Sequence, residues 1–297
     1  MGPTASGKTQ LACALADHFP VELISVDSAL VYRGMDVGTA KPDAATLSLY
    51  PHHLIDLRDP SDPYSVADFR EDALRVMGEI SIRGSVPLLV GGTSLYFRAL
   101  ERGLSELPAA NAATRTALAA EAAQHGWQHL HARLHTLDPQ AAARIRPGDT
   151  QRIQRALEVI KLSGKTLTAQ HGALRARLPW RLLKLALMPR ERVPLHARIA
   201  QRFELMLEQG LLQEAEHLYK RELSAELPAL RAVGYRQALE FLRGEASREQ
   251  LCERGIHATR QLAKRQMTWL RSELDARLFD PDRSDVEARV QAAVAAF

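Results

Sequence analysis

The chain has 297 residues, 46% hydrophobic and 25% charged, so it is long and apolar enough to bury a substantial core and is not expected to be disordered. Its two cysteines, Cys13 and Cys252, lie far apart, which offers neither a disulfide framework nor a zinc site and is typical of a reduced cytoplasmic compartment. The net charge of +4 is compatible with nucleic acid, with phosphorylated metabolites or with neither, and we expect no signal peptide and no membrane span, since no apolar run approaches about 20 residues.

Residues 2 to 103 alternate in the manner of a parallel α/β protein. A glycine-rich turn leads into a predicted helix, Gln10–His18, and the apolar runs Val21–Val26 and Val86–Val90 are predicted strands. Continuous apolar strands between helices indicate a sheet that is covered on both faces. We therefore predict an α/β fold, a P-loop NTPase-like parallel sheet flanked by helices.

The composition changes after Leu107 and Pro108. From residue 109 to about 167 the chain is rich in Ala, Leu, Gln and Arg at helical spacing, which predicts an all-helical insertion. Leu182–Pro189 is predicted to return to the sheet as a strand, and helices are expected to fill the remainder. The predicted domains are a core of residues 1–107 and 178–297 and an insertion of residues 108–177.

The first residues match the phosphate-binding pattern GxxxxGK[ST] in full. Glycines let backbone N–H groups turn toward a phosphate chain, and the following helix presents its positive N-terminal end. Lys8 can reach the terminal phosphate, and the Thr9 hydroxyl can bind Mg²⁺. The alternative is a glycine-rich turn with an incidental lysine. The predicted phosphate-binding residues are Gly2, Pro3, Thr4, Ala5, Ser6, Gly7, Lys8 and Thr9.

A phosphate-binding loop of this kind ordinarily follows a central strand. Here Met1 stands directly before Gly2, so the strand that should lead into the loop is missing from this sequence. A misplaced start codon or a truncation is the explanation that we favour. A chain complete as given would have an uncertain loop geometry and stability.

The expected acidic partner of the loop is Asp27. ATPases usually hold Mg²⁺ with an acid at the end of another strand, yet Val86–Val90 runs into Gly91-Gly92-Thr93 without a carboxylate. Asp27 instead ends the strand Val21–Val26, and the carboxyl ends of parallel strands converge on the ligand. We expect Asp27 near Lys8, as a general base or a metal ligand. The alternative is a helix cap or turn residue.

Further motifs follow the loop along nearly the whole chain, from Gly2 to about Arg271. They are ISVDSALVYRGMDVGTAKP (24–42), HHLIDLRDP (52–60), YSVADFR (64–70), LLVGGTSLYFRAL (88–100), LDPQAAARI (137–145), DTQRIQRALEV (149–159), RAVGYRQ (231–237) and TRQLAKRQMTWLR (259–271). In this order they closely resemble the bacterial tRNA dimethylallyltransferases, also called isopentenyltransferases.

The resemblance implies transfer of a dimethylallyl group from dimethylallyl diphosphate to N6 of the adenosine at position 37 of tRNA, next to the anticodon, with Mg²⁺ as cofactor. The loop would then hold the donor's diphosphate rather than ATP. Asp27 matches the general base that takes the proton from N6, and Thr93 matches a residue lining the channel. Arg202 matches a residue that assists the diphosphate, with Lys8. Negative charge grows on the diphosphate as it leaves, which explains why cationic side chains are expected beside it.

The resemblance also implies a tRNA anticodon stem-loop as partner of a cytoplasmic monomer. The adenine must leave its stack with the neighbouring tRNA bases to reach the general base Asp27. This costs a few kcal/mol, which contacts to the RNA phosphates offset. The residues that match tRNA-contacting segments are Asp27, Ser28, Ala29, Leu30, Thr93, Arg115, Gln151, Arg152, Ile153, Gln154, Arg155, Arg231, Ala232, Val233, Gly234, Tyr235 and Arg236.

Basic side chains share a helix face in three places, and each face is consistent with a phosphate-binding surface or with an ordinary solvated surface. These faces carry Arg152 and Arg155, then Arg198 and Arg202, then Arg260, Lys264 and Arg271.

Three other functions compete with this interpretation. A small-molecule kinase would need a Walker-B acid and an adenine site, and neither is evident. Prenyl transfer to free adenine nucleotides shares the donor chemistry, but the helical insertion and the basic motifs favour a macromolecular acceptor. A non-catalytic RNA-binding module does not explain Gly7-Lys8-Thr9 together with Asp27.

Overall fold

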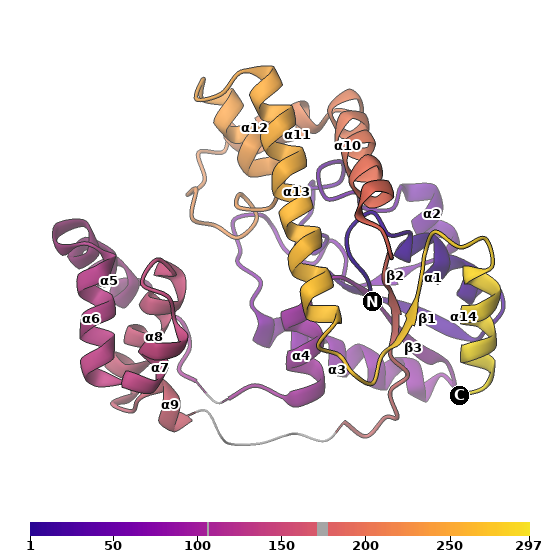
Figure 1. Cartoon of the computed structure of the whole chain (residues 1–297), viewed down its shortest axis with the longest axis horizontal. Helices are drawn as coiled ribbons and strands as arrows, with labels where there is room; N and C mark the ends of the chain where they lie inside the picture. Colours follow the sequence, from indigo (N-terminus) through magenta and orange to yellow (C-terminus); the bar gives the residue numbers. More distant parts are fainter. Residues whose placement is uncertain (106, 171–177) are drawn as a thin grey trace. The chain divides into compact units, whose positions relative to one another are not determined.

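The computed structural model describes residues 1–105, 107–170 and 178–297, which form two compact units (Figure 1). Unit 1 comprises Met1–Glu101 and Leu178–Phe297, and unit 2 comprises Arg102–Arg177. The division thus falls six residues before the start predicted for the insertion, and the predicted end at residue 177 lies outside the described residues.

A parallel sheet lies at the centre of unit 1. Its strands are β1 (Val21–Val26), β2 (His52–His53) and β3 (Val86–Gly91), in the order β2-β1-β3. Both pairings are parallel, with Leu23 of β1 opposite Leu88 of β3. The two strands predicted from their apolar runs are therefore confirmed, since aliphatic side chains on both sides of a strand are stable only when both faces are covered.

Helices cover both faces of this sheet. On one face, α3 (Val66–Ile82) packs its apolar stripe against Ile24 and Val26 of β1. On the other face, α1 (Lys8–Ala16) and α14 (Val286–Ala295) share a core cluster with Leu88 of β3. The predicted parallel α/β arrangement is confirmed, with the first helix beginning two residues earlier than expected.

A second, two-stranded parallel sheet pairs β4 (Leu185–Leu187) with β5 (Arg277–Phe279). β4 is shorter than predicted, and the prediction that it returns to the main sheet is wrong, because it pairs with β5 in this separate sheet. β5 was missed because three residues with one buried side chain carry no detectable period. Met1 lies along β4: its amine donates to Leu185 O at 2.7 Å, and Leu187 N–H donates to Met1 O at 2.9 Å. Within the described residues, no strand precedes the phosphate-binding loop.

The remaining helices of unit 1 lie above the carboxyl end of the sheet in the view of Figure 1 or beside it. The long helix α13 packs against α10 and α12, and at Gly255 an added Cβ would lie 2.0 Å from the ring of Phe203. In the part of the chain that the structure describes, no helix is both long and apolar enough to cross a membrane. The remaining helices are α2 (Ala44–Leu49), α4 (Ser94–Arg102), α10 (Arg192–Glu208), α11 (Leu211–Tyr219), α12 (Tyr235–Leu242) and α13 (Arg248–Leu270).

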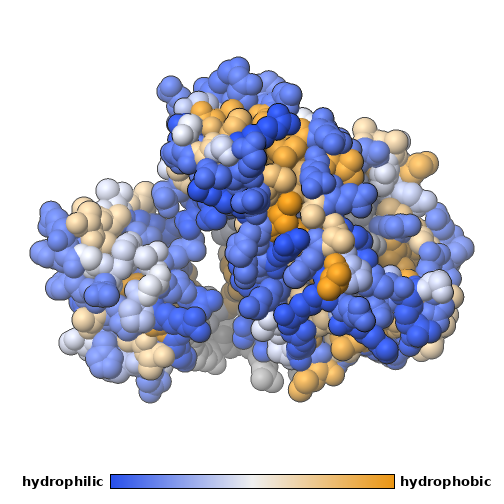
Figure 2. All heavy atoms as spheres, turned by 45° about the horizontal axis from the view of Figure 1, so that its top comes forward, coloured by the Kyte–Doolittle hydropathy of each residue, from blue (hydrophilic) through white to orange (hydrophobic). Residues whose placement is uncertain are grey.

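Unit 2 contains only helices among its described residues and has a core of its own. That core joins Leu118, Leu130, Leu134, Ile153 and Leu157, all essentially buried. The face drawn in Figure 2 is mostly hydrophilic, with hydrophobic residues in small groups, as expected for units that each bury a core. The helices are α5 (Ala112–His125), α6 (Trp127–Leu137), α7 (Pro139–Arg144), α8 (Thr150–Ser163) and α9 (Leu167–Gln170).

Candidate active site

The phosphate-binding loop makes a tight turn into α1. Ala5 and Gly7 both have left-handed backbone angles, with φ of 59° and 79°. Such alternation turns consecutive N–H groups toward one side and forms an anion-binding concavity. Hydrogen bonds within the loop stabilise this turn: Ser6 Oγ and Lys8 Nζ both donate to the carbonyl oxygen of Pro3, at 2.8 and 2.6 Å.

The loop opens into a cavity of about 550 Å³. Four sequence-predicted catalytic residues, Lys8, Asp27, Thr93 and Arg202, line this one cavity although they come from four parts of the chain. Gly2, Pro3, Ser6 and Gly7 do not line it but form the loop's backbone. Further lining residues are Thr4, Ala5, Thr9, Ser28, Ala29, Leu30, Gly91, Gly92, Ser94, Ile199, Phe203, Met206, Arg231, Ala232, Val233, Gly234, Thr259, Leu262, Arg265 and Gln266.

Asp27 stands at the carboxyl end of β1, where the sheet positions it. Its Oδ1 accepts the N–H groups of Ala29 at 2.8 Å and of Leu30 at 3.4 Å. Asp27 is therefore also a turn residue, and these two bonds orient its carboxylate. Thr93, after β3, is tied to the same turn: Ser28 N–H donates to Thr93 Oγ1 at 3.2 Å, and Thr93 N–H donates to Val26 O at 3.2 Å.

Two cations and one carboxylate set the electrostatics of the cavity. Burial lowers the pKa of Lys8 to about 8, although Asp27 acts in the opposite direction, and Arg202 lowers it further. Burial also lowers the pKa of Arg202, again opposed by Asp27. Two desolvated cations around one anion leave positive charge that a bound polyanion would neutralise.

One wall of the cavity is apolar. It is built largely by α10, which contributes Ile199, Phe203 and Met206. Residues at this i, i+4, i+7 spacing lie on one face of a helix. Arg198 of the same helix does not line the cavity and is not simply a solvated residue. Its Nε donates to Ala5 O at 3.1 Å, and its Nη1 pairs with Asp282. Arg198 thus supports the phosphate-binding loop from behind.

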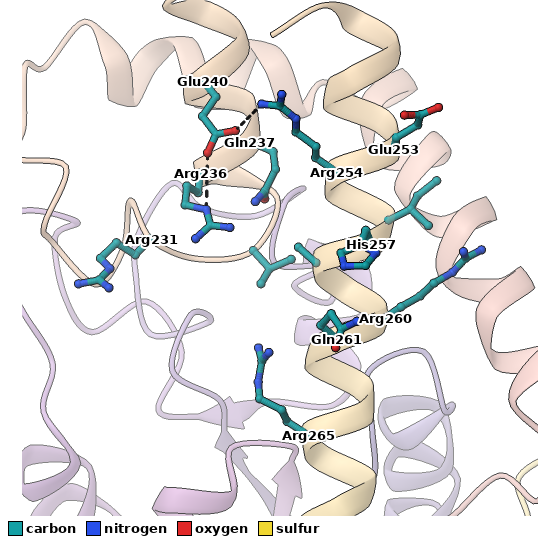
Figure 3. Close-up of a pocket in the computed structure, with 13 residues that line it drawn as sticks. Arg231, Arg236, Gln237, Glu240, Glu253, Arg254, His257, Arg260, Gln261 and Arg265 are labelled. Carbon is teal, nitrogen blue, oxygen red and sulfur yellow. Dashed lines mark hydrogen bonds and ion pairs between the residues drawn. The ribbon is translucent and has the colours of Figure 1, made fainter. Parts of the chain in front are cut away.

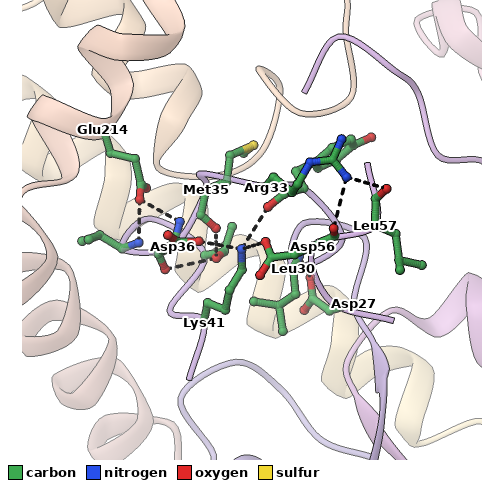
Figure 4. A network of polar contacts seen from close by, with 12 residues as sticks. Asp27, Leu30, Arg33, Met35, Asp36, Lys41, Asp56, Leu57 and Glu214 are labelled. Atoms are coloured by element: carbon green, nitrogen blue, oxygen red, sulfur yellow. Dashed lines mark hydrogen bonds and ion pairs between the residues drawn. The ribbon is translucent and has the colours of Figure 1, made fainter. Parts of the chain in front are cut away.

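A polar network holds the segment that follows the Asp27 turn (Figure 4). The Lys41 side chain is 3% exposed, and its Nζ contacts Asp36 at 2.6 Å, Asp56 at 2.5 Å and the carbonyl oxygen of Tyr32 at 2.9 Å. Beside it, the Glu214 carboxylate of α11 accepts the N–H groups of residues 36, 37 and 38.

A second, basic cavity of about 880 Å³ adjoins the first one, because Arg231, Val233 and Arg265 line both (Figure 3). The acidic residues Glu240 and Glu253 also line it, and Glu240 pairs with two of the arginines, at 3.7 and 3.4 Å. Arginines therefore outnumber acids in its lining. The arginines are Arg231, Arg236, Arg254, Arg260 and Arg265.

Comparisons with known proteins decide the family. A family model described as IPP transferase matches residues 30–273, which is most of the chain. The chain belongs to the IPP transferase family. A tRNA dimethylallyltransferase of Thiobacillus denitrificans is 57% identical over 297 residues, covering 100% of this chain and 95% of the relative. One of Alkalilimnicola ehrlichii is 61% identical over 274 residues, covering 92% and 86%.

Solved structures of the family agree with the fold. The full-length tRNA isopentenylpyrophosphate transferase of Bacillus halodurans has a TM-score of 0.73 at 38% identity, covering 99% of this chain and 94% of that one. A eukaryotic dimethylallyltransferase acting on tRNA has a TM-score of 0.81 at 28% identity, covering 98% and 76%. The family resemblance read from the sequence motifs is thereby confirmed.

Two of the tRNA-contacting residues predicted in unit 2 of this IPP transferase family member, Arg115 and Arg155, pair with one carboxylate. Glu158 is fully buried and pairs with Arg115 at 2.9 Å and Arg155 at 2.7 Å. Gln151 and Arg152 are exposed at the start of α8, and Gln154 Nε2 donates to Arg115 O at 3.1 Å. Ile153 is fully buried in the unit's core, so its side chain offers no surface to a ligand.

The structure places two residues of the predicted 231–236 segment away from the reaction cavity, and it adds residues to the site that the sequence did not assign. Tyr235, predicted to touch tRNA, is fully buried, and Arg236 lines only the basic cavity. Glu214 lies outside the quoted motifs, and Gln266 lies within the 259–271 motif but was given no role there, because a side chain that binds backbone groups is recognised only once the backbone is placed. Arg265 and Arg260 had a signal in their basic helix, which the prediction noted without assigning a site.

Proposed function

We propose that this chain transfers the dimethylallyl group of dimethylallyl diphosphate to N6 of adenosine 37 of tRNA and releases diphosphate, as a P-loop-type core with a tRNA-binding helical insertion. The observation that supports this most is the convergence of Lys8, Asp27, Thr93 and Arg202 on one cavity. Membership of the IPP transferase family supports the same reaction.

The phosphate-binding loop and two cations suit the leaving group. As the bond between the prenyl carbon and the diphosphate oxygen breaks, negative charge grows on the diphosphate. Loop N–H groups, Lys8 and Arg202 stabilise the leaving diphosphate more than they stabilise the intact diphosphate ester. This difference lowers the barrier. The apolar wall of Ile199, Phe203 and Met206 can hold the five-carbon chain and exclude water from the reacting carbon.

The new bond forms between N6 and the prenyl carbon. The lone pair of N6 is delocalised into the adenine ring, so the nitrogen becomes a good nucleophile only as a proton leaves it. Asp27 is held by Ala29 and Leu30 at the cavity wall and accepts that proton. Thr93, bonded to the same turn, lines the space between base and donor.

Mg²⁺ is the cofactor that we propose for the diphosphate. The Thr9 hydroxyl lines the cavity beside Lys8, and a hydroxyl with phosphate oxygens and water is a normal Mg²⁺ environment. No cluster of three or more metal-binding side chains exists among the described residues, which fits a cation held mainly by the substrate. When bound, Mg²⁺ would neutralise charge on the diphosphate.

We propose two surfaces for the tRNA. In unit 1, the arginine-lined cavity adjoins the reaction cavity through Arg231 and Arg265, so phosphates held there would flank a base entering beside Asp27. In unit 2, the exposed start of α8 offers Gln151 and Arg152 to an RNA backbone. The chain is expected to act in the cytoplasm as a monomer.

The test is nucleoside mass spectrometry on unmodified tRNA incubated with the chain, Mg²⁺ and dimethylallyl diphosphate. We expect an adenosine heavier by one dimethylallyl group, confined to position 37 by fragment mapping. Parallel reactions replace the donor by ATP or the tRNA by AMP, which identifies a kinase or a nucleotide prenyltransferase. Product only with AMP, or none in any reaction, would contradict the proposal.

A further inference from the structure

Gln266, on the last turns of α13, bridges two loops of the reaction cavity. Its Oε1 accepts the N–H group of Thr4 in the phosphate-binding loop at 2.8 Å. Its Nε2 donates to the carbonyl oxygen of Gly92, just after β3, at 3.0 Å. The side chain is 9% exposed, so both backbone groups depend on it rather than on water.

A carboxamide of this length satisfies both partners at once. The two bonds require one acceptor and one donor on the same side chain, and an amide supplies both. The space is fitted to it: a Cβ added at Gly92 would lie 2.3 Å from Gln266 Nε2 and 3.0 Å from Gly2 O. The glycine at 92 therefore allows the amide and the loop backbone to come together.

The bridge continues to the proposed general base. Gly92 precedes Thr93, whose Oγ1 accepts the N–H group of Ser28, next to Asp27. Thr4 and Asp27 are thus connected through one side chain and a few backbone bonds across the end of the sheet. These bonds connect the phosphate-binding loop to the turn that carries Asp27.

We propose that Gln266 is a positioning residue that fixes the phosphate-binding loop against the Gly92–Thr93 turn, and so holds the prenyl carbon in line with the attacking nitrogen. The inference rests on the proposed prenyl transfer and adds to it a residue that touches neither reacting atom. Misplacing reactants by about 1 Å can cost on the order of 100-fold in rate.

The first test is Gln266→Met, which keeps the length and approximate volume but removes both hydrogen bonds. We expect kcat to fall about 10- to 100-fold and the Kd for tRNA to change less than threefold. The melting temperature should also fall, because two buried backbone groups lose their partner. The matched control is Gln201→Met, at an exposed position of α10, which should leave kcat unchanged. A kcat within threefold of the parent, or a tRNA Kd that rises in step with the loss of kcat, would overturn the proposal.

A second measurement does not depend on catalysis. Hydrogen exchange of a peptide spanning residues 3–10 should be faster in Gln266→Met than in the parent, because Thr4 N–H loses its acceptor. Gln266→Glu keeps an acceptor for Thr4 and loses the donor to Gly92, so it should retain slow exchange while kcat still falls. An unchanged exchange rate in Gln266→Met would refute the bridge. A parent protein that forms no product would refute the proposed function, and the comparison of exchange rates would still decide whether Gln266 holds the loop.

Discussion

The hydroxyl of Tyr235 donates to Glu214, the same carboxylate that accepts three consecutive backbone N–H groups of residues 36–38. Tyr235 is fully buried, and burial together with this carboxylate raises the pKa of its phenol above the ordinary value. Close packing at this point requires a glycine, since a Cβ at Gly38 would lie 2.6 Å from the Tyr235 ring. The 231–236 segment and residues 36–38 are therefore tied to one helix, α11.

Tyr235→Phe should loosen this connection without emptying the core. Loss of one hydrogen bond to the half-buried Glu214 carboxylate is expected to lower the free energy of unfolding by about 1–3 kcal/mol. Because Arg231 and Gly38 both line the reaction cavity, KM for tRNA should rise more than KM for the donor. Thermal unfolding and steady-state kinetics measure these effects. Tyr219→Phe, at a 44% exposed position of α11, is the matched control and should change neither.

Asp27→Asn should separate catalysis from binding. The amide keeps the shape and can still accept a backbone N–H group, but it cannot take the N6 proton at neutral pH. We expect kcat to fall about 100- to 10,000-fold, with the Kd for tRNA changed less than threefold. Single-turnover kinetics and a filter-binding titration test this. Asp43→Asn, at the start of α2, is the control because asparagine caps a helix as well as aspartate. Loss of tRNA binding together with activity would refute the assignment of Asp27 as the base.

Donor binding should weaken at alkaline pH because of Lys8. Its pKa in the free protein is lowered to about 8, so the side chain loses its proton as the pH rises through 8. A bound diphosphate favours the charged form and raises that pKa, so above pH 8 binding requires proton uptake. The Kd for dimethylallyl diphosphate should then rise up to about tenfold per pH unit. Calorimetric titration between pH 7 and 9.5 measures it. Lys8→Met should bind more weakly with a flat profile, and a flat profile in the parent would contradict the prediction.

Glu158→Gln should destabilise unit 2 in a pH-dependent way. Burial raises the pKa of Glu158, but the bonds from Arg115, the Asn111 N–H group and Arg155 outweigh it, so the pKa lies below its ordinary value. A lowered pKa contributes stability above the unfolded pKa of 4.5 that is lost as the pH falls through the folded pKa.

We therefore expect a loss of about 1–3 kcal/mol at pH 7, less than for a fully buried pair because Arg115 and Arg155 remain 45% and 32% exposed. The difference between parent and variant should shrink below pH 4.5. Urea unfolding followed by hydrogen exchange in residues 112–163 measures it. Glu121→Gln, where the carboxylate is 28% exposed, should cost less. A difference that grows on acidification would contradict the assignment.

An apolar strand engineered onto Met1 should stabilise unit 1. The Met1 amine is paired along β4, and burial lowers its pKa to about 5, which means that the charged amine is costly there. A cavity of about 240 Å³ with an apolar lining from both β3 and β4 lies beside it. Joining about five β-branched residues to the amine removes that cost and adds apolar burial, so the melting temperature should rise by at least about 5 °C. An extension alternating Gly and Ser is the control, and equal melting temperatures would refute the prediction.

The family and the two long strands were determined by local patterns. The phosphate-binding motif, the apolar runs Val21–Val26 and Val86–Val90, and the succession of motifs to Arg271 are properties of neighbouring residues, so they can be read without a fold. Asp27 could be placed near Lys8 by one further rule, that the carboxyl ends of parallel strands meet at one edge. The composition changes near residue 108, six residues after the position at which unit 2 begins.

Only the tertiary structure decided which side chains line the cavities and which hold the backbone. Ile153 and Tyr235 belong to the predicted tRNA-contacting segments, yet both are buried, because a motif marks a segment and not the direction of each side chain. Glu214 and Gln266 bind N–H and C=O groups 174 or more residues away, and such partners have no sequence signature. Every residue carries the same backbone groups, so the side chains that complete them can be identified only after the chain has folded.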